Sequence, residues 1–313
     1  MSARSVEVIA VPFDGFGRAG HQADAADAYL DAGLLDRPDL AMELGPPIRL
    51  PAPSPARGPL TGLMNEDALL ALTDELQERV AACLRDDRFP VVVGGDCSLL
   101  LGTFAGAHAV DDGFGLLFAD GHEDTTPLDV SEDGEAANVE LGLLLGVTGR
   151  RPGFPRPAVL SILDPSRLAA LGQRDVEWRR SMNVASVADL GTFLRSAESV
   201  ADDPGGVGRD AGARLQIGGP WWLHVDLDVL DLSVLPATGV PGEAPDPDSG
   251  GLVWEELTTV LTSAVDEGGC RGLSVAIYDP EQDPGRRHAG RVVELVHALL
   301  EALTGSRRRI VGP

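Results

Sequence analysis

Short apolar runs alternate along the chain with segments in which apolar residues recur at helical spacing. The runs lie at 6–11, 89–93, 115–119, 157–163, 221–225 and 271–277. The helical segments lie at 21–33, 65–84, 98–109, 138–147, 186–200, 253–266 and 286–303. Apolar strands separated by helices are typical of a parallel sheet covered on both faces. We therefore expect a three-layer α/β/α fold with a mostly parallel central sheet.

Segments rich in Pro, Gly and Asp separate these elements and predict loops. They lie at 44–63, 201–219 and 232–251. We expect the second to be an exposed turn or insertion and the third to be an active-site loop. The sequence has no internal repeat and no linker long enough to divide it, so residues 1–313 are expected to form one domain.

Two of the apolar runs end in closely spaced acidic residues. Asp120, His122 and Asp124 follow the run 115–119, and Asp226 and Asp228 follow 221–225. Alternate side chains of an extended chain point to the same side, so each set converges. Carboxylates and imidazole suit a divalent metal, although an Asp after a strand also caps turns. Two such sets favour a metal site, and their number suits a pair of ions.

A third strand end carries Cys97, within the turn Gly94-Gly95-Asp96-Cys97-Ser98. The glycines permit a tight turn. Cys97 opens the next helix at the mouth of the sheet, where it is either a small buried apolar residue or a metal ligand. The sequence leaves both readings open.

The charge and composition of the chain exclude several kinds of chemistry and of binding partner. Its formal net charge is −24, and all 25 basic residues are Arg. The lack of Lys excludes a Walker lysine, a pyridoxal-phosphate Schiff base and a lysine nucleophile. A strongly acidic surface repels nucleic acid and anionic membranes, so we expect neither as a partner.

The three cysteines, Cys83, Cys97 and Cys270, are widely spaced and odd in number. This pattern is unlike a disulfide scaffold and fits a reducing compartment. The first residues lead into a strand without a signal peptide, and no apolar run is long enough to span a bilayer. We expect a cytoplasmic protein.

In order, the motifs Gly-Gly-Asp-Cys-Ser (94–98), Asp-Gly-His-Glu-Asp (120–124) and His-Val-Asp-Leu-Asp (224–228) resemble those of the ureohydrolase (arginase/agmatinase) family. The resemblance extends from 11–15 to 278–280. It implies a three-layer α/β fold, two manganese ions and hydrolysis of a guanidino or similar C–N bond. It also implies a homo-oligomer, a trimer or a hexamer.

The same resemblance implies roles for individual residues. Asp120 and Asp226 would bridge both metals, and His122 and Asp228 would bind the second metal. Asp124 would bind the first metal and orient the bridging hydroxide that attacks the guanidinium carbon, which makes it the candidate catalytic residue.

The chain departs from the family pattern at three positions. Cys97 replaces a ligand His, and a softer thiolate suits Zn²⁺ or Fe²⁺ better than Mn²⁺. The loop 134–140 lacks the His that serves arginases as a proton shuttle, and Ile277 replaces a Glu that clamps the guanidinium. Other residues are therefore expected to bind the substrate: Asn138, Glu135 and Asp279. Glu140 is a further substitute for the clamp, although acids in such loops are usually solvated.

We expect a metal-dependent hydrolase that acts on a small guanidino, amidino or formimino compound. Two alternatives remain open from the sequence. One is an amide hydrolase of the related deacetylase type, and the other is a catalytically silent family member that binds a ligand or regulates a partner.

Overall fold

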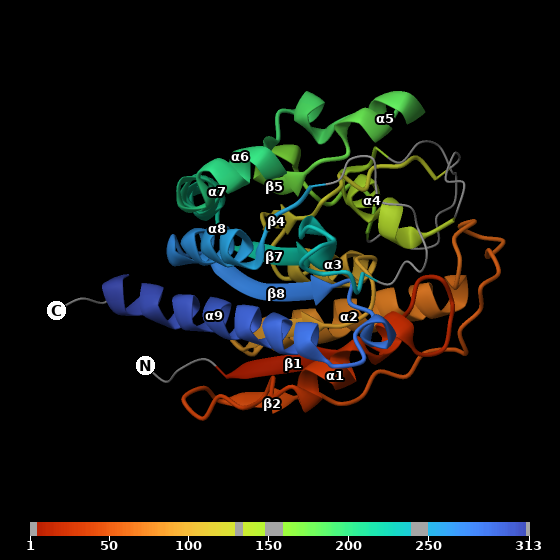
Figure 1. Ribbon diagram of the computed structural model, residues 1–313, viewed down its shortest axis with the longest axis horizontal. Helices are drawn as coiled ribbons and strands as arrows, with labels where there is room; N and C mark the ends of the chain where they lie inside the picture. Colours follow the sequence, from red (N-terminus) through yellow and green to blue (C-terminus); the bar gives the residue numbers. More distant parts are fainter. Residues whose placement is uncertain (1–4, 129–133, 148–158, 239–249, 311–313) are drawn as a thin grey trace.

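Parallel strands form one continuous sheet in the computed structural model, which describes residues 5–128, 134–147, 159–238 and 250–310 (Figure 1). Among these residues the sheet has eight strands in the order β2-β1-β3-β8-β7-β4-β5-β6, and every pairing is parallel. The strands are β1 (Val6–Ala10), β2 (Met42–Leu44), β3 (Phe89–Val93), β4 (Gly115–Ala119), β5 (Leu168–Gln173), β6 (Phe193–Ser196), β7 (Trp221–Asp226) and β8 (Cys270–Ala276).

Helices cover both faces of this sheet. They are α1 (Ala25–Asp31), α2 (Glu66–Arg85), α3 (Leu99–His108), α4 (Glu140–Leu145), α5 (Val176–Met182), α6 (Ala197–Asp202), α7 (Pro204–Ile217), α8 (Trp254–Asp266) and α9 (Arg287–Ile310). One core lies between the sheet and α1, α6, α7, α8 and α9, and the other lies between the sheet and α2, α3 and α4 (Figure 1). The expected three-layer α/β/α fold is confirmed.

Strand β7 shows why the apolar runs are continuous. Its successive residues Trp221 and Trp222 are fully buried in opposite cores, because neighbouring strand residues point to opposite faces. Each indole N–H is satisfied, Trp221 by the carbonyl of Gly268 at 2.8 Å and Trp222 by the hydroxyl of Ser274 at 2.9 Å. A strand buried on both sides is therefore apolar at most positions, with His224 and the terminal Asp226 as the exceptions in β7.

The predicted strand 157–163 is wrong. Residues 157 and 158 lie outside the described residues, 159–163 form no strand, and the strand of this region is β5. Ser161 has a left-handed backbone with φ of 54°. The backbone N–H groups of Ser161 and Leu163 donate to the carbonyls of Leu143 and Leu144, at 3.1 and 3.0 Å. The segment therefore satisfies the end of α4 instead of joining the sheet.

Two further expectations between 186 and 219 are wrong. The predicted helix 186–200 is a short 3-10 turn, then β6 and the start of α6, because Gly191 adopts a left-handed conformation with φ of 80°. The predicted exposed insertion 201–219 is mostly the helix α7, packed against α8. Its glycines suggested a loop, whereas in the fold they allow two helices to approach closely. Strands β2 and β6 and helix α5 were not expected from the sequence.

No helix in the described part of the chain is both long enough and apolar enough to cross a membrane.

The contact between α7 and α8 gives a stability prediction. A Cβ added at Gly212 would lie 2.2 Å from the carbonyl oxygen of Ala264, so Gly212→Ala should force the helices apart and lower the free energy of unfolding by about 1–3 kcal/mol. A Cβ at Gly290 of α9 would meet no atom within 4 Å, so Gly290→Ala should raise the free energy of unfolding by about 0.5–1 kcal/mol. Urea unfolding of both variants measures the difference. Equal effects would show that α7 is not tightly packed.

Candidate metal centre

The acidic motifs meet because their strands are neighbours. β3, β8, β7 and β4 are consecutive in the sheet, and β4 and β7 pair from Gly115 with Trp221 to Ala119 with Val225. The residues that follow β3, β4 and β7 therefore emerge side by side at the carboxyl edge, where open α/β sheets bind ligands.

One group of donors joins the loops after β4 and β7. Asp120, His122 and Asp228 each offer an atom within 4.8 Å of the other two. The Nδ1 atom of His122 lies 2.9 Å from Asp228 Oδ2 and 3.7 Å from Asp120 Oδ1. The backbone N–H of Gly121 donates to Asp228 Oδ1 at 3.0 Å and fixes one loop to the other.

A second group contains Cys97, Asp124 and Glu140, all buried and again within 4.8 Å of one another. Asp124 has φ of 41°, which is unusual for a residue with a side chain, and its carbonyl accepts the N–H of Gly142 in α4 at 2.9 Å. The Cys97 thiol donates to the carbonyl of Ala137 at 3.3 Å. These backbone contacts hold the loop after β4, the start of α4 and the turn after β3 together.

Asp120 and Asp226 combine a turn-capping role with a free oxygen. Their Oδ1 atoms accept the backbone N–H groups of His122 at 2.6 Å and Asp228 at 2.8 Å, as an Asp at a strand end often does. Their Oδ2 atoms are buried and have no hydrogen-bond partner within the described residues. Each aspartate thus caps its own turn while presenting one oxygen to the centre.

Burial and crowding shift the titration of this cluster. Burial raises the pKa of Asp120, Asp124 and Asp226 well above the ordinary value, and the neighbouring carboxylates raise it further. Although burial opposes its charge, His122 has its pKa raised to about 9 by Asp228, and the pKa of Asp228 is in turn lowered despite its own burial. Crowded buried carboxylates are costly without positive charge, so these donors fit divalent cations.

The residues that are expected to bind the substrate differ in their burial and hydrogen bonding. Glu135 and Asn138 are half-buried in the loop before α4. Asp279 is fully buried, with Oδ2 2.9 Å from His21 Nδ1 and Oδ1 accepting the N–H of Glu281 at 2.8 Å. Ile277 follows β8 with a left-handed φ of 63°, a strained conformation for a β-branched residue. The roles of Glu135, Asn138 and Asp279 toward substrate stay predictions.

Glu140 is more buried than acids in such loops usually are. Of the two alternatives left open for it, a solvated loop acid is wrong, because it is fully buried as the first residue of α4, and a substitute clamp stays a prediction. The signal lay in its context, because it stands directly before Leu141-Gly142-Leu143-Leu144-Leu145, a helix that is buried throughout. Asp279, which is expected to bind the substrate, is also buried.

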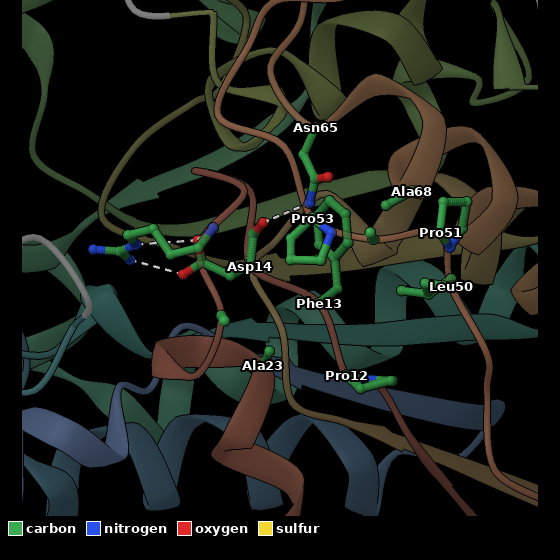
Figure 2. A pocket seen from close by; sticks show the side chains of 12 residues that line it. Pro12, Phe13, Asp14, Ala23, Leu50, Pro51, Pro53, Asn65 and Ala68 are labelled. Atoms are coloured by element: carbon green, nitrogen blue, oxygen red, sulfur yellow. Dashed lines mark hydrogen bonds and ion pairs between the residues drawn. The ribbon is translucent and has the colours of Figure 1, made fainter.

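A pocket beside the end of β1 is a separate feature (Figure 2). Arg18 donates to Asp14 through Nε at 3.1 Å and Nη2 at 2.7 Å, and Asn65 Nδ2 donates to the Asp14 carbonyl at 2.9 Å (Figure 2). Its lining includes none of the predicted metal ligands. Asp14 therefore neutralises Arg18 and organises this corner, and the acidic centre remains the candidate site.

The fold and the donors define a class of protein. Its members are α/β proteins that gather carboxylates, imidazole and thiol at the carboxyl edge of a parallel sheet, where these groups can bind metal. The chain belongs to the Arginase family, whose model matches residues 4–301. Membership favours the main interpretation of the sequence, a ureohydrolase-type hydrolase that acts on a C–N bond of a small molecule, over a silent protein or a deacetylase-type amide hydrolase.

Known proteins show how distant the chain is from its relatives. Human arginase-1 is 25% identical over 315 residues, which cover 98% of this chain and 94% of arginase-1. The arginase of Eremothecium gossypii is 29% identical over 222 residues, 67% of this chain but only 51% of that protein. The solved structure of Bacillus caldovelox arginase has a TM-score of 0.81 at 22% identity and covers 97% of this chain and 99% of its own.

Once a chelator has removed the metal, the folded protein should become less stable as pH rises. A carboxyl whose pKa is raised by folding binds its proton more tightly in the folded state, so its contribution is complete below about pH 4 and is lost as pH rises through the folded pKa. Divalent metal should therefore raise the Tm more at about pH 8 than at about pH 5, because only at the higher pH does it relieve the buried charge. Thermal unfolding with chelator and with added Mn²⁺ or Zn²⁺ checks this. An equal rise at both pH values would contradict it.

Proposed function

We propose that this chain hydrolyses a C–N bond of a small guanidino, amidino or formimino compound with the help of two divalent metal ions. The observation that carries the proposal is the pair of buried Oδ2 atoms of Asp120 and Asp226, for which the described part of the chain supplies no hydrogen bond. Asp120 belongs to one donor group and lies four residues before Asp124 of the other, and Asp226 lies two residues before Asp228. These positions suit carboxylates shared by two ions.

Asp120, His122, Asp226 and Asp228 would hold one ion, and the other would share the two bridging aspartates with Asp124. When bound, such ions activate water near neutral pH and stabilise charge on the atoms bonded to the reacting carbon. Manganese is the first expectation from the family, whereas the Cys97 thiol beside Asp124 favours Zn²⁺ or Fe²⁺.

The chain's own contribution to the reaction centres on Asp124. Burial and neighbouring acids raise the pKa of its carboxyl, which favours uptake of a proton. It would accept a proton from the attacking water and return it to the departing nitrogen, replacing the shuttle His that the loop 134–140 lacks. The C–N bond breaks, the new C–O bond forms, and the amine leaves with the water's proton.

Substrate choice would depend on what faces the reacting group. At Ile277 the chain offers an apolar side chain with 9% of its surface exposed, where the family resemblance places a carboxylate. The proposed polar contacts for the rest of the substrate are the half-buried Glu135 and Asn138 and the buried Asp279. A less cationic or differently shaped amidino compound is therefore preferred over L-arginine and agmatine.

We further propose that the enzyme is cytoplasmic and works as a trimer or a hexamer. All three cysteines are buried thiols, which suits a reducing compartment. The oligomer is carried only by the family resemblance.

Asp226→Asn tests the metal assignment. The amide keeps an oxygen for the Asp228 N–H but removes the negative charge, so both ions should bind far more weakly and turnover should be lost. Metal analysis should give two equivalents for the native enzyme, and a screen of guanidino and amidino compounds for urea, ammonia or formamide release identifies the substrate. Asp164→Asn, at a surface turn where Asp164 accepts the Ser166 N–H at 2.9 Å, is the matched control and should change neither measurement. Full activity of metal-free protein would refute the proposal.

L-Arginine should be a poor substrate. Loss of one partner of a buried charged pair costs about 3–5 kcal/mol, which is a factor of several hundred or more in binding. We expect kcat/KM for L-arginine below about 10⁴ M⁻¹s⁻¹. Ile277→Glu should raise it at least about tenfold, whereas Ile277→Leu, which removes the β-branch without adding charge, should not. Efficient hydrolysis of L-arginine by the native enzyme would show that another acid holds the guanidinium.

A further inference from the structure

We propose that Glu140 is a metal ligand and that Cys97, Asp124 and Glu140 together form a three-donor set for one of the two ions. The inference rests on the proposed function only in taking the centre to be a metal site. It departs from the family pattern, in which the position of Cys97 supplies an imidazole and the position of Glu140 is assigned no ligand.

The burial of Glu140 is the first argument. Its carboxylate oxygens are both buried and have no hydrogen-bond partner within the described residues, and a proton shared with the facing Asp124 carboxyl is the compensation available to it there. Its carboxylate points among donors, since an atom of Cys97 and an atom of Asp124 lie within 4.8 Å of it and of each other. An ionised carboxylate in such a place needs a cation.

Glu66 shows what a structural glutamate looks like at the same kind of position. It is also buried and is also the first residue of a helix, α2. Its carboxylate is fully engaged, because it accepts the N–H groups of Leu60 at 3.2 Å and of Thr61, and the Thr61 hydroxyl at 2.6 Å. Glu140 has the same burial without such donors from the preceding loop, so a structural role of this kind does not explain it.

The backbone holds the three donors before any ion arrives. The Gly142 N–H bonds to the Asp124 carbonyl at 2.9 Å, two residues after Glu140 in the same helix. The Cys97 thiol reaches Ala137, three residues before Glu140, at 3.3 Å. The first contact fixes the start of α4 to the loop of Asp124, and preorganised donors bind metal tightly. The Cys97 sulfur is held close by the second contact and would give it up on binding an ion as thiolate.

The chemistry of this set differs from that of an imidazole and a carboxylate. A thiolate and two carboxylates carry three negative charges, against one for the imidazole–carboxylate pair. The added charge strengthens binding of any divalent ion, and the soft sulfur shifts selectivity toward zinc, cobalt and iron and away from manganese. The two ions of the centre would therefore differ in type.

Titration of metal-stripped enzyme with Zn²⁺ and Co²⁺, followed by calorimetry and absorption, tests the proposal. Wild type should bind two ions, and Glu140→Gln should lose one event or weaken it at least about 100-fold while the other is unchanged. With Co²⁺, wild type should show a thiolate-to-cobalt charge-transfer band. Cys97→Ser should abolish this band, and Glu140→Gln should shift or weaken it.

Glu66→Gln is the matched control, and stability without metal is a second readout. Glu66→Gln should keep both ions but lower the free energy of unfolding, because it removes an acceptor from satisfied donors. Glu140→Gln should leave the metal-free protein as stable as wild type or more so, because it removes an uncompensated acid. Glu140→Asp keeps the charge on a shorter side chain and should weaken the same binding event less than Glu140→Gln.

The outcomes separate this inference from the proposed function. If wild type binds two ions and Glu140→Gln binds both equally well, the inference is wrong and the proposed function stands. If Glu140→Gln keeps both ions but loses affinity for a guanidinium inhibitor, Glu140 is a substrate clamp and the inference is again overturned. If wild type binds a single ion that depends on Glu140 and Cys97, the inference stands and the two-ion function fails.

Discussion

Mutual repulsion among buried carboxylates is the constraint on which the rest of this structure depends. Asp120, Asp124, Glu140 and Asp226 are all buried at one edge of the sheet, and burial raises the pKa of each. A fold can gather such groups only if other interactions hold the loops in place. Here two apolar cores fix the four central strands, and backbone hydrogen bonds fix the loops to one another. Because the cores and the backbone hydrogen bonds hold the loops, the carboxylate oxygens of the centre remain available for cations.

The division of each bridging aspartate into two differently used oxygens makes this possible. One oxygen satisfies the N–H two residues ahead and so shapes the turn, and the other is left for the centre. Structural and ligand roles are therefore not alternatives at these positions. A spacing of two residues serves both, because the chain turns after each strand and the N–H of the second residue comes within reach of the first carboxylate.

The central strands could be predicted because they are apolar on both faces, and the motifs after them mark the sheet edge. β5 could not, since Leu168-Ala169-Ala170-Leu171-Gly172-Gln173 contains few residues that favour strands, while the more apolar 159–163 is used to satisfy α4. α7 was missed because its glycines read as loop, and their packing role exists only once α8 lies against them. The burial of Glu140 could not be predicted for a similar reason, since nothing local distinguishes it from the solvated acids that are common at helix starts. Burial of this kind depends on tertiary contacts.

The alternation of Trp221 and Trp222 across β7 carries a consequence for how the centre assembles. β7 pairs with β4 on one side and β8 on the other, and Asp226 lies opposite Ala276 at the end of this register. A slip by one residue would turn every side chain of β7 to the other face, and each indole would lose its partner, Gly268 or Ser274. The same slip would aim Asp226 away from Asp120. Burial of both indoles with their hydrogen-bond partners therefore requires the same strand register that points Asp226 toward the acidic centre.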